Sequence, residues 1–446
     1  MPAWSSLARN PISIAGAWLT TLSAFAFITY YVAVVLGWLH NPYSGLFGFV
    51  VAPVVFVLGL ALIPIGIWRE ARRRHRGKEP WAWPAINLGN RRARNVVLGV
   101  LVLTVVNLAI VAVAGLGALH YMETDQFCGQ VCHVPMKPEF TAHQAPPHAS
   151  VDCVHCHVSP GASGTIRAKL NGARQAWQFV TGTFHRPIPT PARNLPTAAD
   201  TCVHCHAAGY PQRDLTITKR EYADDETNTE TVTTFLMLMQ ANHWHARADI
   251  SVEYVATDPT RDTIPYVRVT EPGGGITEYF AAGVTTQPSG DLRRMDCLDC
   301  HTRPAHAMSA SAEQAVDRAM AAGEIGRDLP FVKREAVAAL KVEYPSETAA
   351  LEGIRRRMSD FYQTRKEVPA AEVARAIAAL ERTYRTNVFP EMKITWGTYR
   401  SQISHIEPLG CFRCHDEEHK STAGKTIRQD CELCHKELAP PGGQKP

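Results

Sequence analysis

Three long apolar stretches dominate the first part of the chain. They cover residues 12–39, 45–68 and 96–119, and no Asp, Glu, Lys or Arg interrupts any of them. Each stretch contains at least the ~20 residues that a helix needs to cross the hydrocarbon core of a bilayer. The first is too long for the apolar core of a cleaved leader, and no small-x-small cleavage site follows it. The pattern therefore predicts three transmembrane helices.

The connection between the second and third stretches, residues 69–95, is strongly basic. Only Glu70 and Glu79 oppose its positive side chains, and the first connection, 40–44, has no Lys or Arg. The basic residues are Arg69, Arg72, Arg73, Arg74, Arg76, Lys78, Arg91, Arg92 and Arg94. Because basic connections stay in the cytoplasm, we expect an inner (cytoplasmic) membrane protein with residues 120–446 on the periplasmic side.

After residue 119 the hydrophobic pattern changes twice. Residues 250–254 and 264–269 alternate apolar and polar positions, and a glycine run at 273–275 precedes a third such segment, which predicts a small antiparallel sheet. Residues 310–390 instead carry apolar positions at helical spacing, most clearly at 312–322 and 370–384. The predicted fold class is a membrane anchor of three helices plus a mostly α and irregular domain with a small β insertion.

All twelve cysteines fall into six pairs, and each pair is followed directly by a histidine. The first pair has three intervening residues, from Cys128 to Cys132, before His133. The other five read Cys-x-x-Cys-His: Cys153, Cys156 and His157; Cys202, Cys205 and His206; Cys297, Cys300 and His301; Cys411, Cys414 and His415; Cys431, Cys434 and His435. In this motif the thiols bind haem c covalently and the histidine is an axial ligand. The sequence predicts six covalently bound haem c groups, and hence an electron-transfer protein.

Two other uses of paired cysteines fit less well. Zinc ribbons use two Cys-x-x-Cys pairs for one ion, but they do not require a histidine after every second cysteine. Disulfides across two intervening residues would make strained local loops and would connect no distant segments. The core of a domain that binds six haems is expected to form around porphyrin faces rather than side chains. We therefore expect short helices, long ordered loops and little sheet there.

The motifs and patterns together divide the chain. We expect a three-helix membrane anchor at 1–119, a domain with haems 1–3 at 120–246, the β insertion at 247–290, and a C-terminal domain with haems 4–6 at 291–446, including the helical insertion 310–390. The net charge of +4 is too small to indicate a nucleic-acid partner. The expected partners are the lipid bilayer and redox proteins.

Enough histidines remain outside the motifs for bis-histidine ligation of every haem. Nine are candidates, and a distal ligand must approach from the face opposite its proximal histidine. His306 and His419 each follow a motif closely and His148 precedes one, so each is expected to serve a neighbouring haem. The predicted distal ligands are His148, His185, His243, His306, His405 and His419, with His243 and His245 left as alternatives two residues apart.

The first motif follows the third apolar stretch by about nine residues, so its haem is expected at the membrane surface. Met136 is a candidate axial ligand, and a thioether ligand raises haem potential. Ionisable groups surround the same motif: His120, Glu123, Asp125 and Lys137. Quinol oxidation releases two electrons and two protons, so such a site suits it; a plain helix end among lipid headgroups is the alternative.

These features resemble the NapC/NirT family of membrane quinol dehydrogenases. The resemblance rests on the anchor, on Cys128…Cys132-His133-x-x-Met136, and on the segments from His148 to His157, 161–169 and 180–183, and it covers roughly residues 96–206. It implies oxidation of menaquinol or ubiquinol from the membrane quinone pool, with electrons passed to a periplasmic cytochrome or reductase. It also implies that Lys169 approaches the quinol site.

The chain departs from the usual family pattern in three ways. It has three apolar stretches instead of one, a longer first motif, and three further motifs after residue 290, as in the larger inner-membrane cytochromes of anaerobic or extracellular respiration. The family's carboxylate after Lys169 has no clear counterpart, because Gln175 and Ala176 stand there. Besides a quinol dehydrogenase, the sequence therefore leaves open a passive electron-transfer subunit and a terminal oxyanion reductase.

Overall fold

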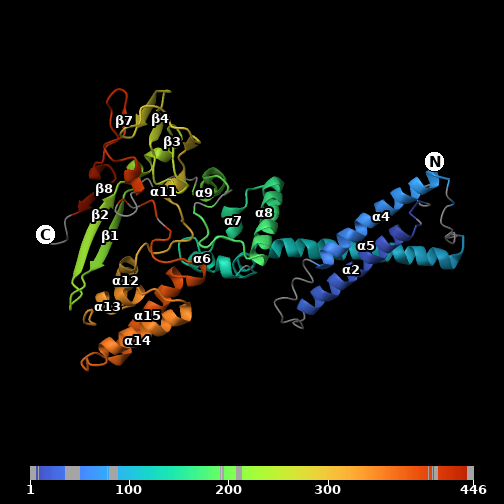
Figure 1. Cartoon of the computed structure of the whole chain (residues 1–446), viewed down its shortest axis with the longest axis horizontal. Coiled ribbons are helices and arrows are strands. Elements are labelled where there is room, and N and C mark those ends of the chain that lie inside the picture. The colour runs from blue at the N-terminus through green and yellow to red at the C-terminus, as the bar shows by residue number, and fades with distance from the viewer. Residues whose placement is uncertain are drawn as a thin grey trace. The chain divides into compact units, whose positions relative to one another are not determined.

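The computed structural model describes residues 7–8, 10–35, 51–77, 79, 89–131, 133–190, 192, 195–206, 213–399, 401–403, 405 and 410–438. The chain divides into two compact units, Met1–Met122 and Glu123–Pro446 (Figure 1). Each unit has its own architecture, and the predicted fold class is confirmed: three helices fit to span a membrane precede a mostly helical part with small antiparallel sheets.

The first unit consists of α2 (Pro11–Val35), α4 (Ala52–His75) and α5 (Arg91–Tyr121). All three are long and apolar enough to cross a membrane. Their ends differ from those predicted, because α4 begins at residue 52 and continues through the arginines to His75. Helical backbone hydrogen bonding does not depend on side-chain polarity. The basic residues therefore lengthen α4 at its end and α5 at its start. The predicted basic loop 69–95 is therefore partly helical.

Small residues bring α2 and α4 into close contact. A Cβ added at Gly59 would lie 2.5 Å from Thr20 Oγ1 and 2.9 Å from the carbonyl oxygen of Gly16. One helical turn or more away, the Ser13 hydroxyl donates a hydrogen bond to the carbonyl oxygen of Ile63 at 2.9 Å. Lipid offers helices no hydrophobic driving force for association, so close backbone packing of this kind holds them together.

Replacing Gly59 with leucine is therefore expected to separate this helix pair. Overpacking of a tight contact costs about 1–3 kcal/mol, and no rotamer of leucine avoids the α2 backbone. The measurement is the thermal unfolding midpoint of the detergent-solubilised chain. Gly99→Leu in α5 is the matched control, because a Cβ at Gly99 meets nothing within 4 Å. Equal midpoints for the two variants would contradict the role of Gly59.

In the second unit, short helices carry the cysteine motifs. They are η2 (Phe127–Val131), α7 (Cys153–His157), α9 (Ala198–His206), α11 (Cys297–Cys300), η5 (Gly410–Arg413) and η6 (Cys431–Leu433). Between them lie α6 (His133–His143), α8 (Ala162–Val180), α10 (Met239–Asn242) and η3 (Trp244–Ala246). The segment around His243 and His245 is thus helical and not a strand.

Two antiparallel sheets follow. One has the order β1-β2-β8, from Leu215–Tyr222, Glu230–Met237 and His435–Leu438. The other has the order β6-β3-β4-β5-β7, from Arg293–Arg294, Ser251–Val255, Tyr266–Thr270, Ile276–Phe280 and Lys420–Ser421. The predicted insertion supplies β3–β5. The first sheet was not predicted, because β1 is exposed along nearly its whole length and shows no apolar face.

The helices of the C-terminal region form a core of their own. They are α12 (Ala312–Ala321), α13 (Val332–Leu340), α14 (Glu347–Tyr362), α15 (Ala370–Asn387) and the short η4 (Pro390–Met392). Ser311 and Ser346 cap α12 and α14 by accepting hydrogen bonds from backbone N–H groups at 3.2 Å. Ile354, Met358 and Leu380 are fully buried between them. Here the expectation of a core built only around porphyrin faces was wrong, since side chains fill it.

Candidate functional site

Five predicted proximal histidines each lie beside a second histidine from another part of the chain. The ring centres are 6.1 Å apart for His157 and His306, 6.2 Å for His206 and His148, 6.4 Å for His301 and His243, 5.9 Å for His415 and His245, and 6.0 Å for His435 and His405. Four of the partners, all except His245, belong to the predicted distal set. His245 lies beside a different proximal histidine from His243, so each of these two alternatives belongs to a pair.

These separations fit an iron held between two imidazoles. An imidazole nitrogen binds a metal ion at about 2 Å, and the ring centre lies about 1 Å behind that nitrogen. Two histidines on opposite sides of one metal therefore have ring centres about 6 Å apart, which matches the five pairs. The pairing also crosses motif boundaries: His148 precedes the second motif but faces the third, and His306 follows the fourth but faces the second.

Backbone carbonyl groups orient several of these rings. In four of them, Nδ1 lies within hydrogen-bonding distance of a backbone carbonyl oxygen. The distances are 3.2 Å from His148 to Pro304, 2.9 Å from His243 to Met239, 2.9 Å from His306 to Glu139 and 2.8 Å from His415 to Arg428. A carbonyl can only accept, so Nδ1 carries the proton and Nε2 carries the lone pair. This is how ligand histidines are commonly held for metal binding.

His419 and His185 are placed differently. His419 is buried, with Nε2 2.7 Å from the carbonyl oxygen of Ile264 and Nδ1 2.9 Å from the Asp416 carboxylate. Both of its ring nitrogens therefore face oxygen atoms of the protein. His185 is exposed. Neither ring lies in contact with any of the five proximal histidines whose side chains the structure describes.

Successive cysteine motifs are spatial neighbours in chain order. Burial raises the pKa of the Cys156, Cys297, Cys300 and Cys434 thiols, and thiols of an adjacent motif raise it further. The neighbours are Cys128 with Cys153, Cys156 with Cys202, Cys202 with Cys297, Cys300 with Cys411, and Cys411 with Cys434. The six cysteine motifs thus form one continuous row.

A buried charge network ties the fourth motif to the fifth. Asp299, inside the fourth motif, is 2% exposed and accepts hydrogen bonds from Tyr254 at 2.6 Å, Arg261 at 2.7 Å and Arg293 at 3.1 Å. Arg413, inside the fifth, donates to the carbonyl oxygens of Asp299 at 2.9 Å and Arg261 at 2.8 Å. Neither residue could be predicted from the sequence, since both occupy variable positions of their motifs.

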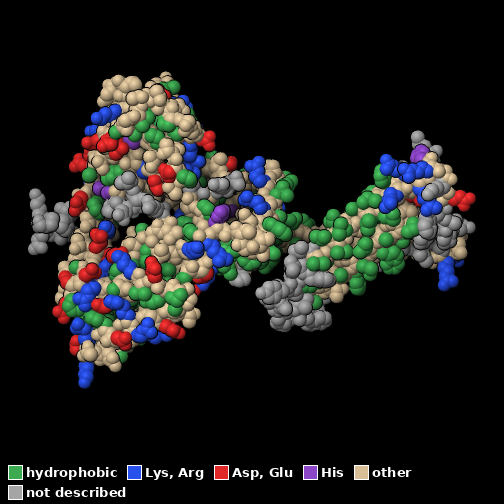
Figure 2. Space-filling model, in the orientation of Figure 1, with side chains coloured by type: hydrophobic (Ala, Val, Ile, Leu, Met, Phe, Trp, Pro, Cys, Tyr) green, Lys and Arg blue, Asp and Glu red, His purple; other side chains and the backbone are tan. Residues whose placement is uncertain are grey.

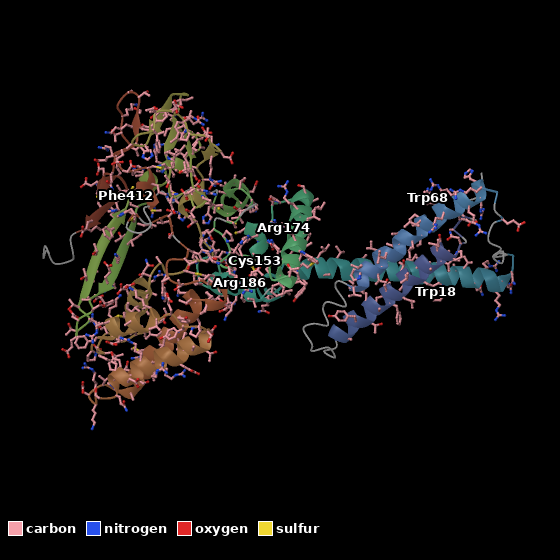
Figure 3. The ribbon with its side chains drawn as sticks, in the orientation of Figure 1. Trp18, Trp68, Cys153, Arg174, Arg186 and Phe412 are labelled. Carbon is pink, nitrogen blue, oxygen red and sulfur yellow. The ribbon has the colours of Figure 1, made fainter. Side chains whose placement is uncertain are left out.

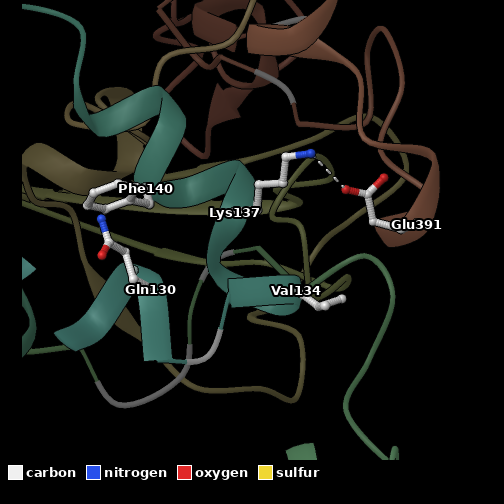
Figure 4. A pocket seen from close by; sticks show the side chains of 6 residues that line it. Gln130, Val134, Lys137, Phe140 and Glu391 are labelled. Atoms are coloured by element: carbon white, nitrogen blue, oxygen red, sulfur yellow. Dashed lines mark ion pairs between the residues drawn. The ribbon is translucent and has the colours of Figure 1, made fainter. Parts of the chain in front are cut away.

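The first motif is described only in part. Cys132 and the side chain of His133 lie outside the described residues, whereas Cys128 lies on η2 and Met136 is half-buried on α6. A pocket with a volume of about 380 Å³ opens beside it (Figure 4). Its lining is Gly129, Gln130, Val134, Lys137, Phe140 and Glu391. Gly129 and Gln130 stand between the two cysteines, so the pocket borders the attachment loop itself.

Lys137 is the ionisable centre of this pocket. Its ammonium nitrogen lies 2.5 Å from Glu347 and 3.4 Å from Glu391. Although burial lowers the pKa of Lys137, the two carboxylates raise it above its usual value. Glu347 begins α14 and Glu391 lies on η4, so both come from the C-terminal helical region. No local sequence signal links residues so far apart, so neither carboxylate could be predicted from the sequence.

The other predicted residues of the quinol site take separate positions. Asp125 accepts a hydrogen bond from the backbone N–H of Cys153 at 2.8 Å; burial raises its pKa, but the bonds to Cys153 bring it below the usual value. Lys169 is half-buried and lies near Cys128. The pKa of the Cys128 thiol is lowered to about 7, mainly by a hydrogen bond with Cys153 and also by the charge of Lys169. His120 is exposed at the end of α5 in the first unit.

Comparisons with known proteins identify the family of the chain. Residues 91–214 match the N-terminal region of the NapC/NirT cytochrome c family. The chain is also 35% identical to the cytochrome c-type protein ImcH of Geobacter sulfurreducens, over 98% of this chain and 89% of ImcH. No solved structure matches the chain. Such cytochromes bind haem c covalently. The chain therefore belongs to the NapC/NirT cytochrome c family, as a membrane-anchored electron-transfer cytochrome similar to ImcH along nearly its whole length.

Proposed function

We propose that this chain is a hexahaem cytochrome c that oxidises quinol in the inner membrane and relays the electrons to periplasmic acceptors. The observation that carries the proposal is the row of histidine pairs and cysteine neighbours that begins beside the pocket at the first motif. Its cysteine and proximal histidine residues would hold six haems, and five would have the histidine partners described above. A bound haem iron takes up and gives up one electron at a time.

The pocket beside the first motif supports quinol binding at this end of the row. Its wall combines apolar groups, such as Val134 and Phe140, with the ion pair of Lys137 and Glu391. Apolar pockets with a few polar groups are typical of small-molecule sites. Lys137 would orient a quinol oxygen by donating a hydrogen bond, and Glu391 would accept the proton that leaves that oxygen. Asp125 would keep the first and second motifs together through Cys153.

Stopped-flow mixing of the purified chain with a reduced menaquinone analogue tests this function. Reduction of all haems at the α-band, sensitive to a quinone-site inhibitor, is the expected result. Reduction by dithionite but not by quinol would contradict quinol oxidation and favour the passive relay. A high-spin signal in the oxidised protein would instead favour the terminal reductase, because catalytic haems leave one axial position open.

Glu391→Gln is expected to slow quinol-dependent reduction about 10²-fold, the usual contribution of a positioned proton acceptor. The amide keeps the size and polarity of the side chain but cannot take up a proton. Dithionite reduction is expected to stay complete. The control is Glu324→Gln. It also removes a carboxylate from an ion pair, but this pair, with Arg382 at 3.0 Å, lies outside the pocket. Equal quinol rates for both variants would rule out Glu391 as the proton acceptor.

A further inference from the structure

An apolar stripe runs along the exposed side of α8. Ile166, Leu170, Trp177 and Val180 are 62%, 70%, 68% and 77% exposed. Single exposed apolar residues are common on protein surfaces, but four on one helix of 19 residues are not. Figure 2 shows hydrophobic and basic side chains side by side over this helix. The stripe therefore needs an explanation.

Helical geometry places the stripe opposite the side of α8 that packs on its unit. Successive residues turn by about 100°, so the four apolar side chains lie within an arc of about 80°. Gly164, which is buried, and Phe179, whose ring stacks on Phe184, lie on the other side of the helix. Lys169, which lies near Cys128, flanks the stripe. The stripe thus faces away from Gly164 and Phe179, and its Lys169 edge lies toward the first motif.

The charges of α8 have one sign. The helix contains Arg167, Lys169 and Arg174 and no aspartate or glutamate. On the helical projection the two arginines border one edge of the apolar stripe and Lys169 borders the other; Arg174 is labelled in Figure 3. An apolar face with tryptophan and leucine, bordered by cations on both edges, is the arrangement of helices that lie in a membrane interface. Basic side chains there extend toward phosphate groups while their stems stay in apolar surroundings.

We propose that α8 lies on the bilayer, with this stripe in the boundary between headgroups and acyl chains and Arg167 and Arg174 on anionic lipid phosphates. The unit that carries α8 begins at Glu123, directly after α5, without an intervening linker. Because α5 is a candidate membrane span, the second unit is covalently tethered to a membrane segment. Binding is then intramolecular, so even a modest intrinsic affinity suffices. A water-soluble protein partner would not have this advantage.

Photo-crosslinking with lipid tests the proposal on the full haem-loaded chain. The chain is placed in nanodiscs of phosphatidylglycerol that carries a diazirine in the upper acyl chain, and labelled peptides are mapped by mass spectrometry. The α8 peptide is expected to be labelled at least ten-fold more than the peptide with Ile276, an equally exposed apolar residue on β5. Labelling of α8 no stronger than that of the Ile276 peptide would overturn the proposal.

Two variants separate the apolar from the electrostatic contribution. Leu170→Gln with Trp177→Gln is expected to reduce labelling of α8 to the level of the Ile276 peptide, while the haem spectrum, which reports folding, stays unchanged. Arg167→Gln with Arg174→Gln is expected to reduce it in phosphatidylglycerol and to have little effect in phosphatidylcholine. Full labelling in both double variants would overturn the proposal. Protection of α8 only after a periplasmic fraction is added would also overturn it, in favour of a protein partner.

Discussion

Replacing His245 with alanine will convert one haem of the chain from a low-spin to a high-spin state. The His245 ring lies 5.9 Å from that of His415 and is the axial partner proposed for the fifth motif. Alanine leaves one side of that iron without a protein ligand, and axial ligands determine spin state and potential. Electron paramagnetic resonance of the oxidised protein is expected to show the loss of about one sixth of the low-spin signal, in proportion to six motifs.

His419→Gln is the matched control for this variant. His419 follows the fifth motif at short range and was predicted to be a distal ligand of a neighbouring haem, but its ring contacts Asp416 and the Ile264 carbonyl. Glutamine keeps a polar group of similar size, so all haems are expected to stay low-spin. Added imidazole is expected to restore the low-spin signal in His245→Ala. If the His419 variant loses signal and the His245 variant keeps it, the assignment of the fifth pair is wrong.

Replacing Asp299 with alanine will destabilise the second unit strongly. The carboxylate is buried and accepts hydrogen bonds from Tyr254, Arg261 and Arg293. Its removal leaves two guanidinium groups without their shared anion, and breaking a buried pair in this way costs about 3–5 kcal/mol. The hydrogen bond from Arg413 to the backbone carbonyl at position 299 is available to alanine as well, so the expected loss comes from the carboxylate alone. The measurement is the unfolding midpoint, followed in the Soret band.

Asp249→Ala provides the comparison. Asp249 also pairs with an arginine, Arg247, at 2.6 Å, but this pair lies at the surface. Exposed pairs contribute little, since water solvates both partners almost as well when they are separated. The midpoint of this variant is expected to match that of the unmodified chain. An equally small change in Asp299→Ala would show that burial of the network contributes nothing to stability.

The local chemistry of the chain could be predicted from the sequence because it depends on short spacings. The run from Cys297 to His301 specifies haem attachment within five residues, and the apolar stretches specify membrane helices by length alone. The strands of the β insertion and the helices at 312–322 and 370–384 were also found, since their periodicity is local. By contrast, apolar and polar residues alternate in β1 only over residues 215–218 and show no regular alternation in β2, so pairing between the two strands decides their conformation.

Tertiary structure decided which distant residues meet. His306 faces His157 across nearly 150 positions of the chain, and nothing in local spacing distinguishes it from His419, which also follows a motif. Glu391 reaches Lys137 only because the C-terminal helices pack as a unit with their own core. The sequence alone determined the cysteine motifs, the membrane helices and the class of protein. The axial pairing, the pocket carboxylate and the exposed stripe of α8 depend on packing, because chain folding and not spacing sets the distances between remote side chains.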